Sequence, residues 1–401
     1  MPSYGANEMS LAGRRVARLR VPTVITGYRS DLDGLRTVAV YLVLLFHAGL
    51  GWFAGGFIGV DVFFCLSGFL VSSLLIGELQ ESGSLRLGRF YSRRIRRLLP
   101  AAVVVVVATG LVFTLLWSVV RRASLVQDAV SALLYYANLH FMVASGDYFA
   151  ANVDKSPYLH FWSLSIEEQF YAFFPVLLLL LFRVRGARRR PVVLGVLTAM
   201  LVVSLADQVY FAMNDVNRAY YGTDTRLYQL LAGALLTATL ALTTYRLPTR
   251  AAQPVAVVGL AGVLLMGSGL WHLSPSARGI GATVASVLLL GGLAQAEGSV
   301  LSRALSIRPM AYLGRISYGT YLWHWPVILA LTTVLDIGPV VVAVMAFAVA
   351  TGLAALSSEL LEIPIRRNAR LDAFTWPVVV AGLATSALVA ALVVPPILER
   401  T

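Results

Sequence analysis

Residues 36–53 read RTVAVYLVLLFHAGLGWF, and residues 55–75 read GGFIGVDVFFCLSGFLVSSLL. Each stretch is long and apolar enough to cross a bilayer core about 30 Å thick, which takes a helix of about 20 residues. The whole chain has the same character, since 58% of its 401 residues are hydrophobic and 13% are charged. A soluble chain of that composition could not bury its apolar surface, so we predict an all-α polytopic membrane protein.

Apolar runs of this kind recur along the chain and predict about eleven transmembrane helices. The runs cover residues 36–53, 57–77, 98–119, 163–182, 191–211, 226–243, 254–271, 280–296, 314–334, 339–361 and 373–396. Residues 125–145 are also moderately apolar, but they contain Asp128 and His140. Because ionisable side chains are costly inside a bilayer, we expect an interfacial or re-entrant segment there.

The net charge of +12 comes mainly from arginines that lie between the apolar runs. Most of them fall in the cytoplasm when the N-terminus is placed inside and the C-terminus outside, as the positive-inside rule requires. The charge therefore reflects topology, and we expect no nucleic-acid partner. We divide the chain into a flexible basic cytoplasmic arm (1–30), a transmembrane domain (31–370) and an extra transmembrane helix that ends outside (371–401).

The first predicted helix carries two ionisable residues, Arg36 and His47, and such residues mark functional sites in membrane proteins. Their spacing of eleven residues puts both on one face of a helix that turns about 100° per residue. The rise of about 1.5 Å per residue separates them by about 16 Å. We expect Arg36 at the inner interface and His47 near the middle of the bilayer. The alternative is a histidine that only packs against a neighbouring helix.

Residues 86–97 read RLGRFYSRRIRR and form a strongly basic loop. Its arginines either serve topology alone or form a cradle for phosphates, because a guanidinium group binds phosphate oxygens in a bidentate manner. Phe90 and Tyr91 lie among the arginines and could stack on a nucleotide base.

Three acidic residues lie near the outer ends of predicted helices. Asp61 stands a little over one turn into its helix, and Glu167 and Glu168 stand in the first turns of theirs. Helix packing around Asp61 is the structural alternative. At the second site the alternative is a helix start capped by Ser163 or Ser165, where carboxylates favour the helix dipole. We expect one glutamate to point into the bundle, where it would bind sugar hydroxyls or orient a base.

A second histidine, His324, lies ten residues after Gly314 at the inner edge of its predicted helix. The helical rise puts it about 15 Å from that edge, so His47 and His324 should share one depth. A metal site would need a third ligand at clear spacing, so we expect no metal. The other histidines, His140, His160 and His272, are expected at interfaces and solvated.

Five blocks occur in order along the chain. They are the Arg36–His47 pair, GGFIGVDVFFCLSGFL at 55–70, FYSRRIRRLLP at 90–100, HFWSLSIEEQFY at 160–171 and SYGTYLWHWP at 317–326, and ELLEIPIRR at 359–367 closes the set. Together they resemble acyltransferase family 3, whose bacterial membrane proteins O-acylate cell-surface glycans, lipid-linked sugars, peptidoglycan or secondary metabolites. The resemblance covers roughly residues 31–370.

The resemblance implies an O-acyltransferase of the bacterial cytoplasmic (inner) membrane. Its expected co-substrate is a cytoplasmic acyl-CoA such as acetyl-CoA, with no tightly bound cofactor, and its acceptor a carbohydrate or lipid-linked glycan. The implied catalytic residues are His47, Arg36 and Glu167. The implied donor-binding residues are Arg36, Arg93, Arg94 and Arg97, and those that bind or support the acceptor are Asp61, Glu168, Ser317, Tyr321 and His324.

On this reading the basic side of the bundle binds the donor, the acidic side binds the acceptor, and His47 stands where they meet. His47 would act as a general base on the acceptor hydroxyl or as a nucleophile through an acyl-imidazole. The alternative class is a proton-coupled transporter, in which the buried histidines and carboxylates relay protons. Relatives with an eleventh helix typically carry an extracytoplasmic SGNH hydrolase-like domain, so such a domain or partner protein is a further expectation.

Overall fold

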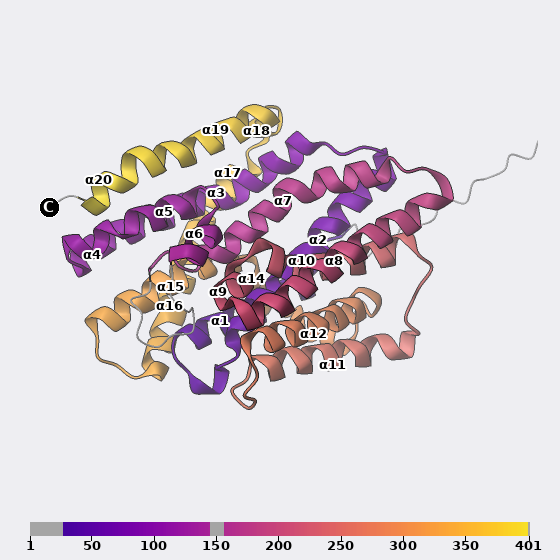
Figure 1. The fold of residues 1–401 in the computed structure, drawn as a ribbon, viewed down its shortest axis with the longest axis horizontal. Coiled ribbons are helices and arrows are strands. Elements are labelled where there is room, and N and C mark those ends of the chain that lie inside the picture. The colour runs from indigo at the N-terminus through magenta and orange to yellow at the C-terminus, as the bar shows by residue number, and fades with distance from the viewer. Residues whose placement is uncertain (1–26, 145–155, 400–401) are drawn as a thin grey trace, which may run out of the picture.

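The computed structural model describes residues 27–144 and 156–399, which fold into a bundle of helices without a strand among them (Figure 1). Within this part of the chain, nine helices are long and apolar enough to cross a membrane. The all-α, multi-pass membrane fold is therefore confirmed. The count of eleven and the sides on which the two termini lie stay predictions. Most of the predicted basic arm, residues 1–26, lies outside the described residues.

Each predicted span overlaps one long helix. These helices are α1 (Ser30–His47), α2 (Gly59–Ser82), α3 (Leu87–Leu116), α7 (Phe161–Phe182), α8 (Arg189–Asn214), α10 (Thr223–Leu242), α11 (Thr249–Gly267), α12 (Pro275–Gln295), α15 (Ser317–Val334), α16 (Pro339–Ser357) and α19 (Thr375–Leu388), which continues into α20 (Val394–Glu399). The shorter helices are α4 (Val119–Ala123), α5 (Leu125–Leu133), α6 (Ala137–Ala144), α9 (Val216–Tyr221), α13 (Val300–Leu305), α14 (Arg308–Arg315), α17 (Ile363–Arg367) and α18 (Ala369–Asp372). Of the eleven, only α1 and α15 fall outside the nine candidate spans.

Helix α1 begins and ends earlier than the apolar run that predicted it. Asp31 and Asp33 stand in its first turn, where carboxylates interact favourably with the helix dipole. The helix stops at His47 because Gly49 adopts a left-handed conformation with φ of 82°, which a glycine reaches without strain. The predicted helix over residues 36–53 placed His47 inside the helix, whereas in the structure His47 lies in the last turn.

Residues 125–144, the described part of the segment before α7, do not form a spanning helix. Helices α5 and α6 contain nine and eight residues, whereas a span needs about 20. They are separated at Tyr135, whose φ of 56° interrupts the helical path. This agrees with the interfacial or re-entrant segment that the sequence predicts.

Helices α1 and α2 run through the bundle, with α11 and α12 side by side along one edge and α19 and α20 beside α3 along the opposite edge (Figure 1). Helices α2 and α10 approach especially closely. A Cβ atom at Gly68 would overlap the carbonyl oxygen of Leu230, and one at Gly233 would overlap that of Cys65. Glycines at these two positions allow backbone-to-backbone packing, as is common between membrane helices.

Candidate functional site

The two histidines that the sequence places at one depth are in contact in the structure. Nδ1 of His47, at the end of α1, lies 2.9 Å from Nε2 of His324 in α15. The rings are nearly parallel, with 5.1 Å between their centroids and an angle of 23° between their planes. The ring of Trp325 lies 4.7 Å from the ring of His47. The end of α1 and the middle of α15 together form a histidine pair.

The hydrogen bonds of His324 define which nitrogens carry protons. Nδ1 of His324 lies 2.5 Å from the carbonyl oxygen of Tyr321, and because a carbonyl only accepts, this nitrogen carries the hydrogen. The ring is fully buried and lies against a second imidazole, which favours its neutral form. Its Nε2 then accepts, so Nδ1 of His47 donates to it. In this arrangement the lone pair of neutral His47 lies on Nε2.

A third histidine, His160, stands beside the pair and was expected to be solvated. That expectation was wrong, because His160 is only 2% exposed. Its ring is perpendicular to that of His324, with 5.6 Å between centroids, and its Nε2 donates to the carbonyl oxygen of Leu322. Burial and, to a lesser extent, the neighbouring His324 hold the pKa of His160 well below its usual range. His160 is therefore neutral.

A cavity of about 950 Å³ leads from the basic side of the bundle toward the histidine pair. One wall is a face of α2 with residues spaced as neighbours on a helix: Phe63, Ser67, Leu70 and Leu74. The other walls come from α1, α3, α7, α14, α15 and residues 358–367. Seven arginines line the cavity: Arg29, Arg36, Arg94, Arg97, Arg315, Arg366 and Arg367.

The cavity-lining arginines that the sequence predicts to bind the donor differ in the side chains that they contact. Arg36 donates to Asp33 at 2.6 Å, and the guanidinium of Arg94 lies 3.2 Å from the centroid of the Tyr171 ring, a cation–π geometry. Within the part of the chain that the structure describes, no carboxylate forms an ion pair with Arg97. The seven arginines outnumber the carboxylates that line the cavity, which are Asp33, Glu167, Glu359 and Glu362. The cavity therefore has an excess of positive charge, as a binding site for an anion requires.

Only one of the two adjacent glutamates of α7 lines the cavity. Glu167 lines the cavity and accepts hydrogen bonds from Ser67 and, at 2.5 Å, from the hydroxyl of Tyr171. Glu168 does not line the cavity. The predicted serine caps were wrong because α7 begins at Phe161, so that Ser163 lies in its first turn and contacts the hydroxyl of Tyr321 at 2.7 Å.

The predicted support residues of α15 lie on the cavity, since both Ser317 and Tyr321 line it. The sequence analysis did not single out Arg315, Arg366 and Arg367 as binding residues, although all three line the same cavity. The last two belong to the ELLEIPIRR block, so the signal was present. Nothing in that block alone shows that it folds back onto α3.

The neighbouring arginines of α3 differ sharply in burial. Arg93, predicted to bind the donor, is exposed and does not line the cavity. Arg96 is 4% exposed and ties α3 to the segment after α16. It donates to the carbonyl oxygens of Arg366 at 3.0 Å and Asn368 at 3.2 Å, and it forms an ion pair of 3.0 Å with Asp372. These bonds hold the segment that supplies Arg366 to the cavity.

Replacement of Arg96 by glutamine should lower the free energy of unfolding by about 2 kcal/mol, since buried hydrogen bonds to a charged group are lost. Arg93→Gln is the matched control, because Arg93 lies on the same helix but is exposed, and it should leave stability nearly unchanged. Thermal unfolding in detergent measures both. An equal loss of stability in the two variants would contradict the role given to Arg96.

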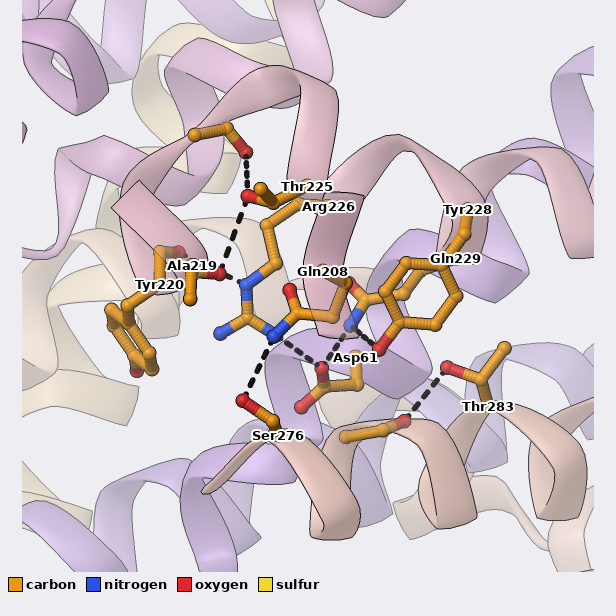
Figure 2. A network of polar contacts seen from close by, with 12 residues as sticks. Asp61, Gln208, Ala219, Tyr220, Thr225, Arg226, Tyr228, Gln229, Ser276 and Thr283 are labelled. Atoms are coloured by element: carbon orange, nitrogen blue, oxygen red, sulfur yellow. Dashed lines mark hydrogen bonds and ion pairs between the residues drawn. The ribbon is translucent and has the colours of Figure 1, made fainter. Parts of the chain in front are cut away.

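Asp61 lies in a separate polar network, shown in Figure 2. It is 1% exposed and accepts from the guanidinium of Arg226 at 2.9 Å and from the side-chain amide of Gln229. Arg226 also donates to the carbonyl oxygen of Tyr220 at 2.9 Å. Asp61 does not line the cavity. The structure therefore does not bring it together with His47, Arg94 and Glu167 as the predicted arrangement required.

The model of the acyltransferase 3 family, described as an acyltransferase domain, matches residues 29–359. The chain belongs to this family. The match contains every predicted site residue and both partners of the histidine pair. It ends before α19 and α20.

Three curated relatives are similar to this family member over most of its length. The chain is 33% identical to "Peptidoglycan O-acetyltransferase OatA" of Listeria monocytogenes over 86% of its residues, and 30% identical to "O-acetyltransferase OatA" of Staphylococcus aureus over 96%. It is 35% identical to "Putative peptidoglycan O-acetyltransferase YrhL" of Bacillus subtilis over 84%. The matches cover 57%, 64% and 55% of these relatives, so the chain spans little more than half to two thirds of their length. No solved structure matches it.

Proposed function

We propose that this family member is an O-acyltransferase of the bacterial cytoplasmic membrane that moves an acetyl group from cytoplasmic acetyl-CoA to a hydroxyl of a cell-wall carbohydrate. The observation that carries the proposal is the arginine-lined cavity whose end, at Tyr321, lies one helical turn from His324. The names of the relatives support O-acetylation and peptidoglycan as the acceptor class. They do not favour the transporter alternative.

The donor would enter the cavity from the basic side. Arg97 approaches three other arginines, Arg36, Arg94 and Arg366, closely enough for mutual repulsion. A diphosphate would relieve that repulsion and accept bidentate hydrogen bonds. The cavity face of α2 runs from Leu74 to Val60, which is about 21 Å at 1.5 Å per residue. That length suits an extended pantetheine arm, which would bring the thioester toward the histidines.

The chemistry follows from the lone pair on Nε2 of His47. This nitrogen would remove the proton of the acceptor hydroxyl while the hydroxyl oxygen attacks the thioester carbon. The carbon–sulfur bond then breaks, and the thiolate takes the proton from His47, so the products are an O-acetyl ester and CoA thiol. His324 would hold His47 in the productive tautomer, as a carboxylate does in a catalytic triad. In the covalent alternative, the same lone pair attacks the thioester first.

The acceptor would approach from the side opposite to the arginines. His47 lies in the last turn of α1, directly before the short helical turns at 51–53 and 56–58. The proposal therefore places the acceptor hydroxyl at this end of the bundle. An extracytoplasmic SGNH-type domain or partner protein, implied by the resemblance, would lie on the same side. Glu167 belongs to the donor side, since it bonds to Tyr171, on which Arg94 stacks.

The test is the release of CoA from acetyl-CoA by the purified protein in liposomes, with a peptidoglycan fragment as the acceptor. Arg97→Gln should raise the KM for acetyl-CoA at least about ten-fold, because a charged hydrogen bond is worth about 1.5–3 kcal/mol. Arg93→Gln is the control on the same helix and should leave this KM near its normal value.

The effect of Arg97→Gln should disappear with S-acetyl-pantetheine, which has no phosphate for Arg97 to bind. An equal loss with both donors would show that Arg97 does not bind the phosphates. Failure of the unmodified protein to release CoA from any acyl donor, with acceptor present, would contradict the proposed function itself.

A further inference from the structure

Aromatic side chains line the cavity at the end nearest to the histidine pair. Phe63 of α2 and Tyr321 of α15 line this end together with Val60, and the two rings meet edge to face with 6.3 Å between centroids. Neither His47 nor His324 lines the cavity. The two rings therefore narrow the cavity on the route from the arginines toward the histidine pair.

The two rings are held in place by different means. The hydroxyl of Tyr321 contacts Ser163 at 2.7 Å and donates to the carbonyl oxygen of His160 at 3.1 Å, while the backbone carbonyl of Tyr321 accepts from His324. Tyr321 is thus fixed at both ends. Phe63 is partly exposed to the cavity on an otherwise mostly buried helix. Its size, and not a hydrogen bond, determines how wide the passage beside Tyr321 is.

We propose that Phe63 and Tyr321 form a constriction that selects short acyl groups by size. This inference rests on the proposed function, because it assumes a thioester donor in the cavity. The acyl carbon must pass the two rings to come within reach of Nε2 of His47. Every further methylene of the acyl group must pass them as well. Phe63 is therefore a specificity-determining residue, and the preferred acyl group is acetyl.

The constriction acts on the acyl end of the donor and leaves its binding at the arginines intact. In the transfer step, the ester bond to the acceptor oxygen forms and the carbon–sulfur bond breaks, with the hydroxyl proton passing through His47 to the thiol. A longer acyl-CoA would bind its phosphates in the same way but would stop before this step. Butyryl-CoA should accordingly inhibit acetyl transfer competitively.

The experiment compares kcat/KM for acetyl-CoA, propionyl-CoA and butyryl-CoA in the unmodified protein, Phe63→Ala and a control. Removal of the ring should raise the ratio of butyryl to acetyl transfer at least about ten-fold, the usual effect of one or two methylenes in a tight pocket. The control is Leu66→Ala, because Leu66 lies on the same helix but does not line the cavity. Its ratio should match that of the unmodified protein.

A second variant, Phe63→Leu, covers the case in which Phe63→Ala does not fold, and it should shift the ratio in the same direction. Equal transfer of all three acyl groups by the unmodified protein would overturn the inference. So would an unchanged ratio in folded Phe63 variants that still transfer acetyl, or an equal shift in Leu66→Ala. Absence of transfer from every donor would instead contradict the proposed function and the inference with it.

Discussion

His47→Gln should reduce acyl transfer by about 10²–10⁴-fold, the usual contribution of a positioned general base. Glutamine is polar and similar in length, but its amide cannot take a proton from the acceptor hydroxyl or attack a thioester. The reduction should appear in kcat, because the arginines that would bind the donor line the cavity, whereas His47 does not. Acceptor-dependent CoA release measures it, and thermal unfolding should show that the variant stays folded.

The matched control is His140→Gln. His140 contacts Asp128 at 2.7 Å between α5 and α6 and does not belong to the histidine pair. Its replacement should leave acyl transfer close to that of the unmodified protein. The acyl-transfer activity of His324→Gln should lie between those of His47→Gln and His140→Gln. A side-chain amide oxygen can still accept the hydrogen of His47 Nδ1. Substantial activity in His47→Gln, or equal losses in all three variants, would refute the proposed division of roles.

Asp61→Ala should lower the free energy of unfolding by about 3–5 kcal/mol, because it leaves the buried guanidinium of Arg226 without its counter-ion. Both side chains of the pair are almost fully buried, with 2% and 5% of their surface exposed. The loss should appear as a lower midpoint of thermal unfolding in detergent and a lower yield of folded protein. The variant that does fold should keep its KM for acetyl-CoA.

The double variant Asp61→Asn/Arg226→Gln tests the cause. It removes both charges, so it should be less destabilised than the sum of the two single variants. Arg218→Gln is the control for the loss of an ion pair as such, because Arg218 pairs with Asp224 at 2.7 Å on the exposed surface. Its unfolding midpoint should hardly change. A strong loss in Arg218→Gln, or additive losses in the double variant, would contradict this explanation.

The sequence predicted the membrane fold and a shared depth for His47 and His324 for a simple physical reason. Apolar runs define membrane helices, and the helical rise then gives the depth of each ionisable residue. Errors in the bounds of the helices did not prevent this result. The first helix was placed too late because an apolar run does not show at which residue a helix begins or ends, whereas Asp31 lies in its first turn and Gly49 terminates it.

Other parts of the site depend on contacts that sequence spacing does not contain. The position of Asp61 in the sequence is equally consistent with a functional carboxylate and with a structural one. Its partner Arg226 lies 165 residues away along the chain. One short stretch of α3 contains three arginines with different environments. Arg93 is exposed, Arg96 is buried in structural contacts and Arg97 lines the cavity. The rotation of α3 against its neighbours determines which environment each arginine has. Distant packing sets that rotation.

The hydrogen bonds of the histidine pair have a consequence for electroneutrality. In the neutral arrangement assigned above from these contacts, the two imidazoles, one of them anchored to the main chain through Tyr321, would bring no net charge into the bundle. A carboxylate in the position of His324 would bring a permanent negative charge, which an apolar environment opposes. Here a charge would arise on the pair only while His47 holds the proton of the acceptor, and it would vanish when the thiol leaves. The bilayer interior would thus accommodate an ion only for the lifetime of the reaction.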